Sequence, residues 1–267
     1  MVYEILTMVI TGVVAGVLSG MFGLGGGVVI VPILYVFLKH IGVPEEVNMH
    51  IAVATSLAVM IVTTCNSIWS HHRKGHIMWP LMAKLAPWMI LGSILATILA
   101  HFVHADWLRY LFILMLVYII LNSIFKKGFT EKYQISDFRE PPKVLGRCVS
   151  AAVGFFAVLL GVGGSLFTVP FFRRFKCPMT QASALAVALT PCVSIFGAAG
   201  YIIAGMHAGV DFPYDVGYIY LPAFIGISIG TLFGVPVGTK LSSSLDDRYL
   251  ARTYIVLLFI FLVMIVV

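Results

Sequence analysis

The sequence carries the same cluster of glycines twice, each time inside an apolar stretch. Residues 16–34 read GVLSGMFGLGGGVVIVPIL, and residues 154–172 read GFFAVLLGVGGSLFTVPFF. Over the 17 positions that align 16–32 with 154–170, six pairs are identical and four of these are glycines. Glycine loses the most backbone entropy on ordering and weakens a helix interior. Each cluster therefore predicts a break between two helical segments, at matching places in two halves of the chain.

Composition sets the class of protein around these breaks. The chain is 60% hydrophobic and only 10% charged, with a mean hydropathy of +1.03, whereas soluble domains carry roughly 25% charged residues. The apolar runs do not alternate as the strands of an outer-membrane barrel do. We therefore expect an all-α, polytopic membrane protein, with the first ten residues in its first membrane segment rather than in a cleaved signal.

The apolar segments fall into two sets of five, separated by one long hydrophilic run. The segments cover about 5–22, 27–38, 51–70, 82–103 and 107–125, and then 148–160, 165–175, 182–204, 217–240 and 249–267. We predict an N-terminal transmembrane repeat at 1–125, a linker at 126–147 and a C-terminal repeat at 148–267. The second segment of each set is shorter than the roughly 20 residues that a spanning helix needs. Each glycine break is thus either a re-entrant helical hairpin or one broken span, followed by three transmembrane helices.

Basic residues predict the orientation in the membrane, because short cytoplasmic loops are rich in Lys and Arg. The linker carries six of them: Lys126, Lys127, Lys132, Arg139, Lys143 and Arg147. With the linker in the cytoplasm, every loop obeys the rule only if each glycine-broken segment returns to its own side. The two halves then have inverted topology, an arrangement found in secondary transporters. Since loop orientation accounts for the net charge of +6, we expect no nucleic-acid partner.

The motifs together resemble one known family. The run GxxxGxxGxGGGxxxVPxL from Gly16, the AxATS sequence from Ala52, the HHRKGHI loop and the degenerate second copy GVGGSLFTVP are similar to those of the TauE/SafE-type sulfite exporters. The resemblance covers essentially the whole chain. It implies a multi-pass permease of the bacterial inner membrane that moves sulfite, thiosulfate or organosulfonates.

The glycine breaks also predict a binding site. The N-terminus of a helix exposes unpaired N–H groups and the positive end of the helix dipole, and glycine lets an oxyanion approach the backbone. Close helix packing is the alternative role for such small residues. Hydroxyls on the next helix of each half, and one amide further along, are candidate donors. The predicted substrate-binding residues are Gly23, Gly25, Gly26, Gly27, Thr55, Ser56, Asn66, Gly161, Gly163, Gly164, Ser165 and Thr190.

Other functions find little support in the sequence. No Asp or Glu lies in the middle of an apolar segment, and Cys65, Cys148, Cys177 and Cys192 have no metal-ligand spacing. We therefore expect free thiols, no metal, no cofactor, no catalytic residues and no enzyme activity. The predicted partners are a small sulfur-containing anion and the lipid bilayer, and a homodimer stays open. The predicted function is a secondary transporter of such anions, with a passive anion channel as the alternative.

Overall fold

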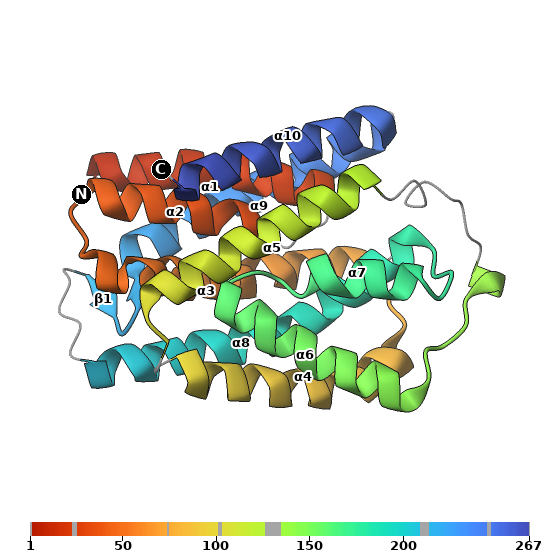
Figure 1. Ribbon diagram of the computed structural model, residues 1–267. Helices are drawn as coiled ribbons and strands as arrows, with labels where there is room; N and C mark the ends of the chain where they lie inside the picture. Colours follow the sequence, from red (N-terminus) through yellow and green to blue (C-terminus); the bar gives the residue numbers. More distant parts are fainter. Residues whose placement is uncertain are drawn as a thin grey trace.

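The computed structural model describes residues 2–22, 26–73, 75–100, 103–125, 135–208, 214–244 and 247–266. Within them the protein is almost entirely helical (Figure 1). The helices are α1 (Val2–Phe22), α2 (Gly27–His40), α3 (Glu45–Arg73), α4 (Trp79–Ala100), α5 (Ala105–Phe125), α6 (Lys143–Leu160), α7 (Ser165–Arg173), α8 (Met179–Ala208), α9 (Leu221–Ser244) and α10 (Asp247–Val266). A 3-10 turn, η2 (Ile135–Asp137), precedes α6, and strands β1 (Asp215–Val216) and β2 (Ile219–Tyr220) form a short antiparallel hairpin before α9.

The helices end and restart at the two glycine clusters, as predicted. α1 ends at Phe22 and α6 ends at Leu160, while α2 begins at Gly27 and α7 at Ser165, so both pairs are separated by 138 residues. Gly26 has a φ of 86° and Gly161 a φ of 63°, a region that side chains with a Cβ rarely adopt. Left-handed glycine at these positions therefore accounts for the break in each half.

Each break turns the chain back on itself. The amide of Arg139, just before α6, donates a 3.1 Å hydrogen bond to the carbonyl of Phe175, just after α7. In Figure 1 the N-terminus and the connection from α2 to α3 likewise lie at one end of the molecule. At 1.5 Å per residue α2 is about 21 Å long and α7 about 14 Å, against a hydrocarbon core of about 30 Å. Both pairs have the geometry of a helical hairpin with one short arm.

Small residues let helices of the two halves pack closely. α1 lies along α9, where Gly12 faces the carbonyl of Ile227 and Gly230 faces that of Val9. α4 lies along α6, where Gly92 faces the carbonyl of Ala151. A Cβ at any of these glycines would overlap the neighbouring backbone, and close backbone approach is the usual basis of helix packing in membranes. The first helix of each half is thus joined to the fourth helix of the other.

α3 and α8 pack against each other and form the core. Residues 48–60 of α3 and 184–190 of α8 are buried on every side. α3 starts at Glu45, earlier than the apolar segment that begins at residue 51, because acidic side chains stabilise the first turn of a helix.

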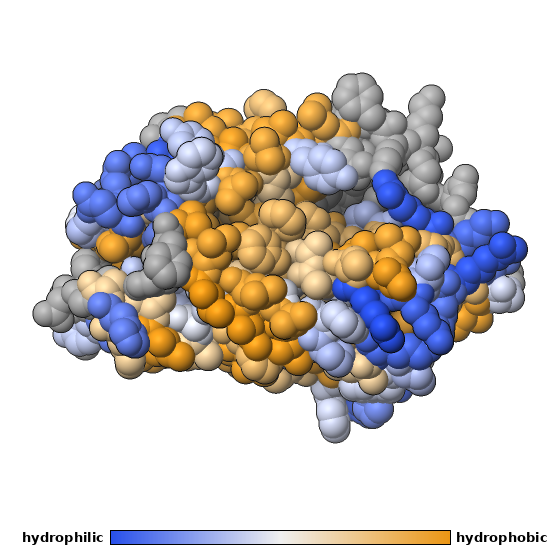
Figure 2. Space-filling model, turned by 60° about the horizontal axis from the view of Figure 1, so that its bottom comes forward, coloured by the Kyte–Doolittle hydropathy of each residue, from blue (hydrophilic) through white to orange (hydrophobic). Residues whose placement is uncertain are grey.

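Apolar side chains cover the outside of the helices. Figure 2 shows a broad hydrophobic band on one face, between two hydrophilic ends. On α4 this surface includes Leu91, Leu95 and Ile98, which are 40–60% exposed. Five helices of the described part are long and apolar enough to cross a membrane. A surface of this kind is stable only in lipid, so the chain is a multi-pass membrane protein.

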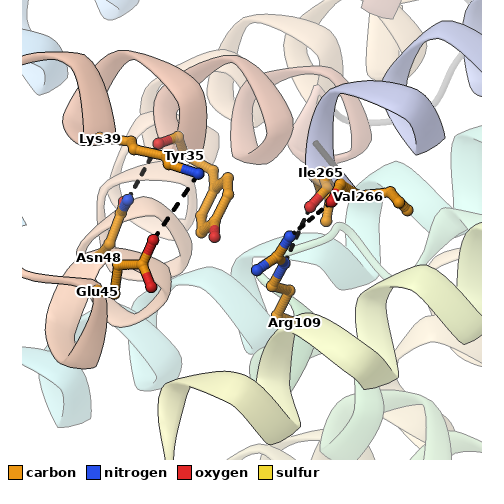
Figure 3. Close-up of polar contacts among 7 residues, drawn as sticks. All are labelled: Tyr35, Lys39, Glu45, Asn48, Arg109, Ile265 and Val266. Atoms are coloured by element: carbon orange, nitrogen blue, oxygen red, sulfur yellow. Dashed lines mark hydrogen bonds and ion pairs between the residues drawn. The ribbon is translucent and has the colours of Figure 1, made fainter.

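Polar contacts tie four helices together at one end of the molecule (Figure 3). Arg109 at the start of α5 donates to the last carbonyls of α10, at 2.9 Å to Ile265 and 3.0 Å to Val266. Its guanidinium lies 5.4 Å from the ring centre of Tyr35 on α2. Asn48 on α3 in turn donates to the Tyr35 carbonyl at 3.2 Å. A cation at a helix C-terminus is favourable because the unpaired carbonyls there are partly negative.

Candidate functional site at the two glycine breaks

The two glycine breaks touch each other inside the protein. Gly27, the first residue of α2, lies against the turn that follows α6. A Cβ at Gly27 would contact the carbonyl of Gly161 and lie 2.7 Å from the Cα of Val162. Only a residue without a side chain fits there without moving the partner backbone. Gly26 and Gly27 are therefore brought together with Gly161, as the sequence predicts for two helix termini that meet.

The turn at Gly161 is a regular helix end. The amide of Val162 donates to the carbonyl of Ala157 at 3.0 Å, and that of Gly161 donates to Val158 at 3.2 Å. With Gly161 in the left-handed region, these are the two bonds of a Schellman motif. The motif satisfies the last carbonyls of α6 and turns the chain toward α7.

α3 completes this junction from the side. The hydroxyl of Ser56 donates a 2.9 Å hydrogen bond to the carbonyl of Gly161. A Cβ at Gly161 would lie 2.9 Å from the Cα of Val53 and 3.1 Å from Cγ2 of Val31. Gly161 is thus enclosed by α2 and α3, and its carbonyl has a fixed partner.

Both short helices present unpaired N–H groups at this place. The carbonyl of Gly26 accepts from Val29 and Ile30, and that of Gly164 accepts from Phe167 and Thr168, at 2.9–3.2 Å. Ahead of these, four buried amides have no acceptor among the described residues: those of Gly27, Val28, Ser165 and Leu166. Unpaired amides at the positive end of a helix dipole are the usual donors to an oxyanion.

Side-chain hydroxyls add to the donors on the α7 side. Ser165 is 2% exposed and Thr168 is 3% exposed, and neither hydroxyl has a hydrogen-bond partner in the part of the chain described. Thr168 Oγ1 lies 3.6 Å from the position of a Cβ on Gly164. Sequence reasoning missed Thr168, although a threonine one turn after GVGGS, where the first copy has an isoleucine, was a visible signal.

The remaining predicted residues occupy other places. Thr55 is fully buried and accepts a 3.1 Å hydrogen bond from the amide of Tyr220 in the β-hairpin. Thr190 donates to the carbonyl of Ala186 in its own helix, at 2.9 Å, so its proton is committed. Asn66 is half-buried and lies ten residues from Ser56 on α3, or about 15 Å at 1.5 Å per residue. Gly163 is buried in the turn before α7, and Gly23 and Gly25 lie outside the described residues.

The nearest buried cation on this path stands at the far end of α7. Arg173 Nη1 donates to the carbonyl of Cys177 at 3.3 Å, eight residues from Ser165 and so about 12 Å along the helix. Burial raises the pKa of the Cys177 thiol to about 11, although the positive charge of Arg173 acts to lower it. All four cysteines are free, as predicted. Positive potential at the junction therefore comes from backbone dipoles.

The fold and the site define a helical membrane protein of the transporter class. The chain belongs to the sulfite exporter TauE/SafE family, whose profile matches residues 8–265. It is 29% identical to a probable membrane transporter protein of Haemophilus influenzae, over 96% of both chains. It is 27% identical to a probable membrane transporter protein of Methanocaldococcus jannaschii, over 91% of this chain and 88% of that one. It is also 24% identical to the probable membrane transporter protein YunE of Bacillus subtilis, over 97% and 94%. No solved structure matches the chain.

Proposed function

We propose that the protein is a secondary transporter of small sulfur-containing anions, which bind at the junction of the two glycine breaks. The observation that carries the proposal is the meeting of Gly27 with the Gly161 turn beside four buried amides without acceptors. Such a site binds an oxyanion through dipoles and needs no charged side chain. The family's description as sulfite exporters supports the choice of sulfur oxyanions.

We further infer that the two halves are inverted repeats. The helix ends at the breaks repeat with a constant spacing of 138 residues. The contact of α1 with α9 also has its counterpart in the contact of α6 with α4. In Figure 1 the N-terminus lies at one end of the molecule and the start of α6 at the other. Rocking of two such halves about a central site would expose it to each side in turn.

Cysteine labelling tests this topology on two described residues. In a cysteine-free background, we expect Arg139→Cys to react with an impermeant maleimide only from the cytoplasmic side and Glu46→Cys only from the opposite side. Both side chains are exposed in the structure. Labelling of both residues from one side would overturn the inverted arrangement.

Binding and flux measurements test the substrate. The purified protein is expected to gain thermal stability in sodium sulfite, thiosulfate or isethionate and none in taurine or sodium chloride, since a ligand that binds the native state stabilises it. Proteoliposomes should take up the same anion at a saturable rate. A protein that binds none of the three anions would refute the proposal. Discrete single-channel currents in a planar bilayer would replace it with the passive channel.

A further inference from the structure

The hydroxyls of Ser165 and Thr168 are unusual among the buried hydroxyls of this protein. Elsewhere in the helices such groups donate to the carbonyl four residues earlier, at 2.6–2.9 Å: Thr64 to Met60, Ser93 to Met89, Thr97 to Ser93 and Thr190 to Ala186. Thr168 stands four residues after Gly164 but makes no such bond. A buried hydroxyl without a partner destabilises the fold unless a ligand or water satisfies it.

The place of Thr168 has an exact structural counterpart in the first half. Ile30 stands four residues after Gly26, as Thr168 stands four residues after Gly164. A Cβ on Gly26 would lie 3.3 Å from Cδ1 of Ile30, and one on Gly164 would lie 3.6 Å from Oγ1 of Thr168. The same position above the glycine thus holds a methyl group in the first half and a hydroxyl in the second.

The residue at the start of each short helix differs in the same direction. α2 begins with Gly27 and α7 with Ser165. Ser165 and Thr168 are three residues apart, so their side chains lie on one face of α7. One turn of α7 therefore offers two hydroxyls and two free amides, whereas the first turn of α2 offers amides alone.

We propose that the transported anion binds on the α7 side of the junction, with Thr168 and Ser165 as its side-chain donors, and that these two hydroxyls determine the affinity for oxyanions. The inference rests on the proposed function, since it assigns residues to that same site. The first half then closes the site with Gly27 and the apolar side chain of Ile30. Recognition is one-sided although the backbone is repeated.

The test uses the full-length purified protein and sodium thiosulfate, with sulfite and isethionate as further probes. Thr168→Val keeps the shape of the side chain and removes the hydroxyl. We expect the thiosulfate Kd to rise roughly ten- to a hundred-fold, the range for loss of a hydrogen bond to a charged group. The melting temperature without anion should stay equal or rise, because an unsatisfied polar group has been removed. Thr168→Ser should bind within about threefold of the parent.

Thr64→Val is the matched control, because Thr64 is a buried threonine whose hydroxyl is bonded within α3. It should leave the Kd unchanged. Ser165→Gly gives the second half the residue of the first, and it carries the test if Thr168→Val cannot be recovered folded; a rise in Kd is again expected. Parent-like binding by Thr168→Val or by Ser165→Gly would overturn the inference while leaving the proposed function intact. If the parent itself binds none of the three anions, the proposed function fails and this inference fails with it.

Discussion

The hydroxyl of Ser56 donates a 2.9 Å hydrogen bond to the carbonyl of Gly161, which lies 105 residues further along the chain. That carbonyl also faces Gly27, so one atom brings together α2, α3 and the end of α6. Its position follows from the left-handed conformation of Gly161. The junction of the two halves is thus held by backbone geometry and one side-chain donor.

Removal of that donor should destabilise the protein. Ser56→Ala leaves the buried carbonyl of Gly161 without its partner, which costs about 1–3 kcal/mol. We expect a lower melting temperature in a thermal unfolding assay. Ser67→Ala is the control, because Ser67 is only partly buried and donates to Thr63 in the same helix. Equal melting temperatures for the two variants would mean that the Ser56 bond contributes nothing.

Alanine at three glycines should separate steric overlap from backbone strain. Gly42 has a φ of 85° with nothing within 4 Å of its Cβ position, so Gly42→Ala should cost only about 1–2 kcal/mol of strain. Gly161→Ala adds an overlap at 2.9 Å from Val53 Cα, and should cost more. Gly27→Ala meets the Gly161 turn and should also abolish anion binding. Normal thiosulfate binding by Gly27→Ala, measured by calorimetry, would show that the junction opens without loss of the site.

Substitution of Thr55 should loosen the β-hairpin and weaken binding. The Tyr220 amide donates to Thr55 Oγ1 at 3.1 Å, and Tyr218 stacks on His50 at 5.2 Å between ring centres. Thr55→Val leaves the buried amide without an acceptor, so hydrogen exchange of residues 218–220 should accelerate. If Thr55 also contacts the anion, the Kd should rise roughly ten- to a hundred-fold. Thr55→Ser, which keeps the oxygen, should change neither quantity; faster exchange with an unchanged Kd would remove Thr55 from the site.

Cys177 should react slowly with maleimides in the folded protein. Burial raises its pKa from 9.0 to about 11, so about one thiol in a thousand is ionised at pH 8, and the thiolate is the reactive form. The raised pKa also stabilises the folded state fully below pH 9, a contribution that is lost as the pH rises through 11. Mass spectrometry after N-ethylmaleimide at pH 8 should find Cys177 unmodified in folded protein and modified in dodecyl sulfate. Prompt modification in the folded protein would contradict the burial of this side chain.

The sequence by itself determined the features that arise from local backbone chemistry. The breaks at Gly26 and Gly161 were predictable because glycine ends a helix through its own φ and its lack of a side chain. Apolar composition likewise required a helical membrane protein, since buried backbone groups in lipid must bond within their own segment. The register of 138 residues, visible in the sequence, fixed where the helices end in both halves.

Only the tertiary structure decided which groups meet and which hydroxyls are already paired. Thr190 and Thr168 look alike as threonines in apolar segments. One donates to its own helix, and the other lies unpaired beside Gly164. The contact of Gly27 with Gly161 likewise depends on how α2 packs against α3 and α6. Side-chain pairing is set by the neighbours that packing supplies, and no local pattern in the sequence encodes those neighbours.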